Sequence, residues 1–176
     1  MSNSEGRWRE PASLLPLHWG HYADRYVFGI VLIIGGAIQL QGSNTFTLIF
    51  LLIGMAAHIT GWAILPSRGW RRIVVIVPAT AQIWLLLTGP LSVWMFAIPF
   101  TCWLVVRHRP WRSYPTVVLP IANGIVLPHF FTEYSAMPQA ISISMAVLVG
   151  SAWIARAIAT TVPTPSTFAK SRSTIV

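Results

Sequence analysis

Three polar side chains lie inside long apolar stretches of this sequence and are the first candidates for chemistry: His58, Gln82 and Asn123. Polar and ionisable groups are costly in hydrocarbon, so chains often keep them there to bind a solute or to relay a proton. The alternative is structural, because such side chains also form hydrogen bonds to neighbouring helices and hold a bundle in register. The sequence favours the structural role for each residue and leaves a polar site in the middle of a membrane open.

His58 shares one helical face with three small residues. Gly54, Ala57, His58 and Gly61 follow the i, i+3, i+4, i+7 spacing, which places all four on one side of a helix. Small residues let two helices approach closely. This face is therefore expected to pack against another helix rather than against lipid.

Gln82 and Asn123 each follow a proline in the same apolar stretch, Pro78 and Pro120 respectively. Proline removes a backbone donor and kinks helices, and transporters place substrate sites at broken helices near the middle of the membrane. An Arg-x-Trp-Arg sequence precedes both stretches, at residues 68–71 and 109–112. This similarity indicates either duplicated hairpins or the independent preference of tryptophan and arginine for the membrane interface.

A further candidate lies at the far end of the fifth apolar stretch, where His129 and Glu133 are four residues apart. On a continuous helix they would share a face. They would then form an outer mouth that binds a cation, or that accepts a proton as the external pH changes. A solvated helix end without such a role is the simpler interpretation.

The sequence predicts no metal site and no cofactor. His18, His21 and Asp24 offer three possible ligands without a fourth, and on a helix the third is rotated about 120° from the first. Haem ligation by two histidines would require His58 and His129 to lie at the same depth, and their places in their stretches differ.

No motif of an established enzyme class is present. The sequence lacks a Gly-x-Ser-x-Gly elbow, a phosphate-binding glycine loop, a His-Glu-x-x-His pair and a Cys-x-x-Cys pair. The chain has 4 acidic residues, and Glu5, Glu10 and Asp24 precede the first apolar stretch. A catalytic site built on carboxylates is therefore unsupported, and we expect no enzymatic activity.

The elements that hold these residues are predicted to be transmembrane helices. Charged residues make up 9% of the chain and hydrophobic residues 55%, with a mean hydropathy of +0.64, whereas soluble domains carry about 25% charged residues. Gly, Pro and Asn favour tight turns within successive pairs of stretches. We therefore expect an all-α, polytopic membrane protein with six transmembrane helices in three hairpins, at residues 26–41, 45–65, 73–88, 91–106, 115–131 and 139–157.

Lysine and arginine occur only at alternate connections between these stretches. They form four groups: Arg7, Arg9 and Arg25; Arg68, Arg71 and Arg72; Arg107, Arg109 and Arg112; and Arg156, Lys170 and Arg172. Cytoplasmic loops retain basic residues, so the pattern places both termini in the cytoplasm and the chain in the plasma (inner) membrane. The net charge of +8 then faces anionic lipid headgroups, and nucleic acid is not expected as a partner.

The chain divides into three regions. Residues 1–25 are predicted to be a cytoplasmic segment whose part 10–25 is amphipathic and lies in the interface; residues 26–159 form the membrane domain, and residues 160–176 a disordered cytoplasmic tail. Residues 73–88 would rise about 24 Å, less than the roughly 30 Å of the hydrocarbon core. Residues 73–106 therefore either cross twice, with their ends in the interface, or enter and return on the cytoplasmic side.

These features predict an accessory or assembly subunit without catalytic activity of its own. Its partner would be another membrane protein or a second copy of the chain. A small transporter or channel is the alternative, which the prolines and the polar residues within the helices support. An intramembrane enzyme ranks last because the sequence offers no nucleophile and no acid–base pair.

Overall fold

The computed structural model describes residues 10–15, 20–44 and 46–161, and in these ranges it contains helices and no strands. The prediction of an all-α chain with six helices is confirmed. The α-helices are α1 (Tyr22–Gln41), α2 (Leu48–Ile64), α3 (Gly69–Leu86), α4 (Ala97–Val106), α5 (Val118–Val126) and α6 (Met137–Thr160). Short 3-10 helices lie at η1 (Pro11–Leu14), η2 (Pro90–Phe96), η3 (Trp111–Val117), η4 (Leu127–His129) and η5 (Tyr134–Ala136).

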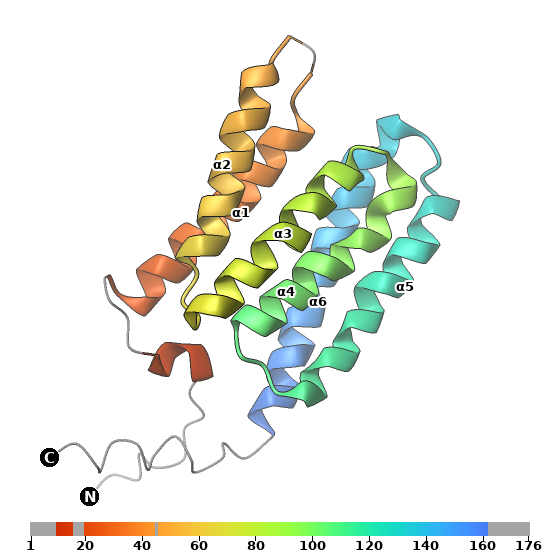
Figure 1. Cartoon of the computed structure of the whole chain (residues 1–176). Coiled ribbons are helices and arrows are strands. Elements are labelled where there is room, and N and C mark those ends of the chain that lie inside the picture. The colour runs from red at the N-terminus through yellow and green to blue at the C-terminus, as the bar shows by residue number, and fades with distance from the viewer. Residues whose placement is uncertain (1–9, 16–19, 45, 162–176) are drawn as a thin grey trace, which may run out of the picture.

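The helices run up and down in sequence, and consecutive helices form antiparallel pairs (Figure 1). α1 packs mainly on α2, and this pair contacts the remaining helices mainly through α3. α4 and its 3-10 helix η2 pack on α3, and α5 with its 3-10 helix η3 packs on α6 and on η2. The connections between α2 and α3 and between α4 and α5 lie at the lower end of the bundle in Figure 1, and the other three lie at the upper end.

Proline determines where the fourth and fifth helices are interrupted. η2 begins with Pro90, and η3 contains Pro115, so in both stretches a 3-10 turn precedes the α-helix. Pro120 lies at the start of α5, directly after this change of helix type. α3, by contrast, continues through Pro78. The third helix is therefore not interrupted at its proline.

Two segments of the described chain are both long and apolar enough to cross a membrane, Tyr22–Gln41 and Tyr134–Thr160. Leu48–Ile64 and Pro90–Val106 are also apolar, but each is shorter than these two segments. α3 carries Arg71 and Arg72 in its first turn, which lowers its hydropathy. Among the described residues before α1, the helical segment is η1; residues 1–9, and residues 16–19 of the predicted amphipathic stretch, lie outside the described residues.

Glycine allows the backbones of α1 and α2 to touch. A Cβ atom placed on Gly36 would lie 2.5 Å from the carbonyl oxygen of Gly54, and one placed on Gly61 would lie 2.7 Å from that of Gly29. Gly29 and Gly36 are seven residues apart, as are Gly54 and Gly61, so the two pairs meet in register along antiparallel helices. The predicted small-residue face thus lies against α1, with Ala57 half-buried.

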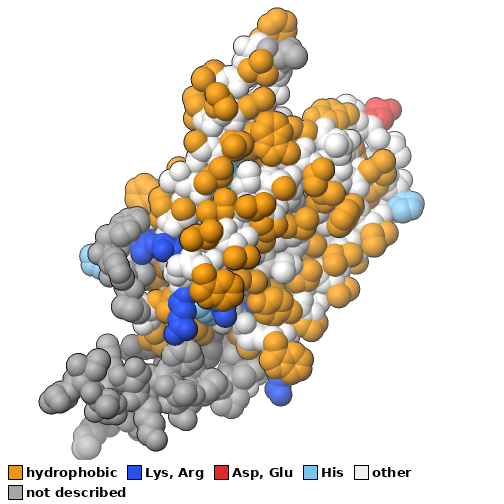
Figure 2. Space-filling view, viewed as in Figure 1, with side chains coloured by type: hydrophobic (Ala, Val, Ile, Leu, Met, Phe, Trp, Pro, Cys, Tyr) orange, Lys and Arg blue, Asp and Glu red, His pale blue; other side chains and the backbone are white. Residues whose placement is uncertain are grey.

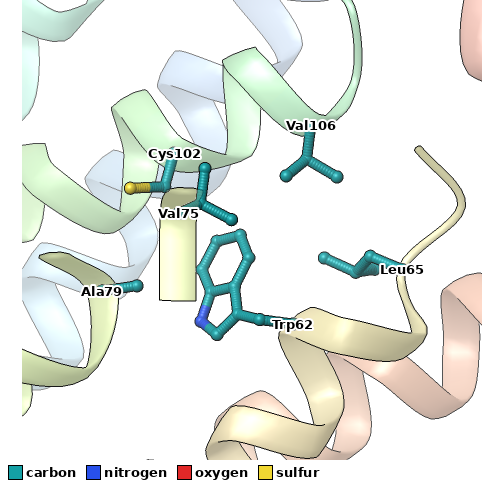
Figure 3. Close-up of a cluster of buried hydrophobic side chains, with 6 residues drawn as sticks. All are labelled: Trp62, Leu65, Val75, Ala79, Cys102 and Val106. Atoms are coloured by element: carbon teal, nitrogen blue, oxygen red, sulfur yellow. The ribbon is translucent and has the colours of Figure 1, made fainter. Parts of the chain in front are cut away.

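A buried apolar cluster joins the α1–α2 pair to α3 and α4. Figure 3 shows the Trp62 side chain pointing from α2 toward Val75 and Ala79 of α3. The other members of this cluster are Leu65, Cys102 and Val106. Cys102 is the only cysteine of the chain and is buried, so no disulfide within one chain contributes to this junction.

Candidate functional site

The charged side chains are sorted to the two ends of the bundle. Figure 2 shows basic groups at the lower end of the molecule and an acidic group at the upper end. The arginines of the described ranges occur at the start of α1, in the two lower connections with the turns next to them, and near the end of α6. Glu133 lies at the opposite end, in the connection before α6. The basic connections, which alternate with connections without Lys or Arg along the sequence, thus lie together at one end of the bundle.

Three of these arginines cap the C-terminal ends of helices. Arg25 Nε donates to the carbonyl oxygen of Ile64 at 3.0 Å, and Arg72 Nη1 donates to that of Ala63 at 3.1 Å, both at the end of α2. Arg71 Nη1 donates to the carbonyl oxygen of Val105 in α4 at 3.2 Å. The last carbonyls of a helix lack partners within it and carry the negative end of its dipole. The basic end therefore stabilises α2 and α4 directly.

Glu10 connects the N-terminal segment to the connection between α4 and α5. Its Oε2 atom lies 2.6 Å from Arg107 Nη2, and its Oε1 atom lies 3.2 Å from Arg109 Nη2. Arg107 Nη1 also donates to the hydroxyl oxygen of Tyr22 at 2.7 Å. We call Glu10, Tyr22, Arg107 and Arg109 the Glu10 cluster; the Arg109 side chain is 1% exposed and that of Glu10 14%.

Aromatic rings hold both guanidinium groups of this cluster. Arg107 Cζ lies 4.4 Å from the centre of the Tyr26 ring and 5.5 Å from that of Trp103. Arg109 Cζ lies 5.6 Å from the same Trp103 ring. Cations over aromatic faces are attracted by the ring quadrupole, more strongly when they are desolvated. Arg107 is thus held by α1 and α4, and Arg109 by α4, in addition to their contacts with Glu10.

His108 follows the end of α4, and its backbone adopts the left-handed conformation, with φ of 54°. Its Nε2 atom lies 3.3 Å from Ser67 Oγ, which links the two lower connections. Burial, together with the positive charges of Arg71 and Arg68, lowers the pKa of His108 to about 4. The imidazole is therefore neutral at pH 7, and this hydrogen bond involves no additional charge at the basic end.

His58 has a partner for each of its ring nitrogens. Its Nδ1 atom lies 3.1 Å from the carbonyl oxygen of Ile33 in α1, and Trp62 Nε1 donates to its Nε2 atom at 3.0 Å. A carbonyl oxygen accepts only, and the indole N–H donates only. The arrangement therefore requires the neutral tautomer with hydrogen on Nδ1, and His58 acts as a hydrogen-bonded bridge between α1 and α2.

Asn123 and Gln82 differ in their hydrogen bonding. Asn123 Nδ2 donates to Ser144 Oγ of α6 at 3.0 Å, and this hydroxyl donates in turn to the carbonyl oxygen of Ala140 at 2.8 Å. Gln82 is 2% exposed, and its Nε2 atom has no partner among the described residues. Thr80 Oγ1, two residues earlier in α3, is likewise buried and without a partner in this part of the chain.

The three predicted intramembrane residues form no hydrogen bond with one another in the part of the chain that the structure describes. His58 bonds to α1, Asn123 bonds to α6, and within the described ranges no hydrogen bond connects either of them to Gln82. His58 and Gln82 are each 2% exposed, so neither side chain lines a space that water enters. His58 and Asn123 are thus engaged at two different helix interfaces, α1 with α2 and α5 with α6.

His129 and Glu133 form hydrogen bonds with different partners. The helix ends at His129, whose Nδ1 atom bonds to the carbonyl oxygen of Ile125 at 2.9 Å. Glu133 Oε2 accepts from Ser135 Oγ at 3.2 Å. Because the helix does not continue to Glu133, the two residues do not share a helical face.

Metal-ligating side chains do not gather in the described part of the chain. His21 Nδ1 lies 3.5 Å from Asp24 Oδ2 on the surface, while His18 lies outside the described residues. No group of three His, Cys, Asp or Glu side chains lies close enough to hold a metal ion in that part.

Several partners in these contacts were not predicted from the sequence. Trp62 follows His58 by four residues, a helical spacing at which side chains meet, so this pair was detectable. The seven-residue spacing of Gly29 and Gly36 was detectable in the same way. Glu10 gives no such signal, because it is 97 residues from Arg107.

Comparison with known proteins does not assign a function to these contacts. No protein-family model matches the chain, and neither a curated protein nor a solved structure shows significant similarity to it.

Proposed function

We propose that this chain is an integral membrane protein of six crossings with both termini in the cytoplasm, and that it acts by assembling with a membrane partner. The observation that carries the membrane arrangement is the sorting of the described arginines to one end of the helical bundle. Basic residues stay on the cytoplasmic side during insertion. α1 and the segment Tyr134–Thr160, which are long and apolar enough to cross, would fix the direction of the bundle.

The full crossing of residues 73–106 is supported by the position of the turn after α3. Gly89 lies at this turn, and a Cβ atom on it would be 3.6 Å from Tyr134 Cδ2, in the connection between α5 and α6. Tyr134 begins one of the two segments of sufficient length. The turn after α3 therefore reaches the same level as the outer end of that segment, which a shallow re-entrant pair would not do.

Tryptophan side chains support the same placement at the basic end. Trp70, Trp111 and Trp153 are 62%, 76% and 75% exposed. Arg71 and Arg112 lie over the rings of their neighbours Trp70 and Trp111, at 5.4 and 5.8 Å from the ring centres. Exposed tryptophan next to arginine is typical of the headgroup layer. The preference of tryptophan and arginine for the membrane interface would explain both Arg-x-Trp-Arg sequences without a duplication of hairpins.

Single cysteines test the topology. Native Cys102 is 6% exposed and should not react with a membrane-impermeant maleimide in intact cells. Cysteine at Leu91, which is 77% exposed, or at Ser135 should react from outside, whereas cysteine at Gly69 should react only after the cells are opened. The reverse pattern would reject the orientation. Reaction at Ser135 without reaction at Leu91 would show that residues 73–106 do not cross.

An assembly role, rather than catalysis, is supported by the use of the polar residues. His58 and Asn123 are each engaged in bonds between helices, with α1 and α6 respectively. Such bonds hold a bundle in one arrangement and leave neither group available to a substrate. The role is therefore expected to depend on the shape of the lipid-facing surface and on the basic end.

Transport is the second candidate, and one observation favours it. Gln82 Nε2 and Thr80 Oγ1 are buried, lack partners within the described ranges, and follow Pro78 in the same helix. Proline frees a carbonyl oxygen one turn earlier, and unsatisfied polar atoms near the middle of a membrane are typical of solute pathways.

One experiment separates the two candidates. The wild-type chain and the variant Gln82→Leu are purified in mild detergent, and the proteins that accompany them are identified by mass spectrometry. Assembly predicts the same partner in the same amount for both chains, because the Nε2 atom that the variant removes has no partner among the described residues. If the wild type purifies without a stoichiometric partner or second copy, and proteoliposomes show solute flux that Gln82→Leu abolishes, the assembly proposal fails and transport replaces it.

A further inference from the structure

The Glu10 cluster contains more positive than negative charge. The carboxylate of Glu10 is shared by two guanidinium groups, Arg107 and Arg109. Arg156 of α6 lies close enough to act electrostatically on Arg109 as well. The other acidic residues of the described ranges, Asp24 and Glu133, bond to His21 and Ser135 instead. One carboxylate is therefore surrounded by cations at the end of the bundle where lipid headgroups are expected.

The two guanidinium groups are positioned independently of the carboxylate. Trp103 lies against both, and Tyr26 lies against Arg107. Such contacts persist when the anion between the arginines is exchanged, because they involve the faces of the guanidinium groups rather than only their N–H groups. The arrangement is thus preorganised for an oxyanion.

The N–H groups and the hydroxyl of the cluster fit a phosphate better than a single carboxylate. Each oxygen of Glu10 faces one arginine. Tyr22 accepts from Arg107 Nη1, so its own hydroxyl hydrogen is available for another acceptor. A phosphate group has more oxygen atoms than a carboxylate and is a preferred ligand of paired arginines.

We propose that Arg107, Arg109 and Tyr22 form a binding site for a phosphate group, and that Glu10 occupies this site in the structure as an internal substitute. Binding of a phosphate displaces Glu10 and releases η1 from the connection between α4 and α5. A lipid headgroup and a free phosphate share the required chemistry. The lipid source rests on the membrane placement given under Proposed function, whereas binding of free phosphate does not.

The variant Glu10→Gln tests the site in the full-length protein. It keeps the shape of the side chain and removes the competing charge. Binding of inorganic phosphate to the detergent-purified protein is measured by calorimetry, and binding of phosphatidylglycerol by native mass spectrometry against phosphatidylcholine. We expect at least about a tenfold gain in affinity over wild type for one of these anions, equivalent to about 1.4 kcal/mol. Adding Arg107→Gln and Arg109→Gln should abolish the gain.

Asp24→Asn is the matched control, because Asp24 is a carboxylate at the same end of the bundle that bonds to His21 rather than to the cluster. A gain of equal size in this control would show a general effect of charge and would overturn the proposal, as would the absence of a gain with both anions in Glu10→Gln. A gain with phosphatidylglycerol alone assigns the site to a headgroup; a gain with inorganic phosphate assigns it to a soluble ligand.

A second measurement leaves Glu10 intact. Ala12 is 0% exposed, so cysteine at this position is protected while η1 is docked. We expect it to react with a maleimide at least about tenfold faster in saturating phosphate, or in vesicles that contain phosphatidylglycerol, than without either anion. Equal rates under all these conditions would contradict displacement of Glu10. This result is independent of the topology test, because labelling at Ser135 and Gly69 reports on orientation alone.

Discussion

Replacing Gly124 with alanine should separate α5 from η2 and destabilise the half of the bundle that contains them. A Cβ atom on Gly124 would lie 2.0 Å from the Cα atom and 2.3 Å from the backbone nitrogen of Trp94. These are backbone atoms, so no change of rotamer relieves the overlap, and one helix has to move. Overpacking in tight interiors costs about 1–3 kcal/mol, and we expect a value at or above the upper end. Thermal unfolding of the purified protein in detergent measures it.

Gly150→Ala is the matched control for this prediction. Gly150 lies in α6, and a Cβ atom on it would meet nothing within 4 Å. The control should unfold at the wild-type temperature or slightly above it, because alanine favours a helix over glycine by about 1 kcal/mol. Equal unfolding temperatures for the Gly124 and Gly150 variants would show that α5 and η2 are not in the close contact described above.

His58→Leu should destabilise the contact between α1 and α2 through the loss of the bridge from Trp62 to Ile33. The leucine removes the acceptor for Trp62 Nε1 and the donor for the Ile33 carbonyl oxygen. A buried donor left without a partner costs about 1–3 kcal/mol, although bonds within membrane proteins average about 0.6 kcal/mol. We expect a loss of about 1–2 kcal/mol, measured as the change in unfolding free energy in mixed detergent micelles.

Trp62→Phe completes a double-mutant cycle with this substitution. It removes the indole N–H and keeps an aromatic ring in the apolar cluster. The double variant should lose less stability than the sum of the two single variants, because the unsatisfied N–H is absent. Additive losses would mean that the histidine and the tryptophan act separately. Unchanged stability of His58→Leu, together with altered proton flux in proteoliposomes, would instead support a relay.

The sequence was sufficient for the class of fold and for the number of helices, because both depend on local patterns. Apolar stretches and the turn residues between them identify helices, and the spacing of Gly54 and Gly61 identifies a packing face. The sequence did not identify the partner of that face, since several other helices contain small residues. The register in which Gly36 meets Gly54 follows from contacts between two helices, which no single stretch encodes.

The limits of the sequence are clearest where the contacts are distant along the chain. The bond from His58 to Ile33 spans 25 residues, and the one from Glu10 to Arg107 spans 97. The sequence left open a polar site formed by His58, Gln82 and Asn123, because it places all three within apolar stretches. Depth does not determine which way a residue faces around its helix axis, and the structure turns His58 toward α1 and Asn123 toward α6.

In the membrane arrangement proposed above, the arginine caps link the insertion of the chain to its folding. Arg25, Arg71 and Arg72 bond to the last carbonyls of α2 and α4, so the same guanidinium groups that resist translocation also complete the helices. A chain inserted upside down would carry these groups across the bilayer or leave the helix ends without them. Lysine in their place would preserve the insertion signal but lose the planar fork of donors. Exchanging these arginines for lysine should therefore yield correctly oriented molecules that are less stable, and so separate the biogenesis of this protein from its final assembly.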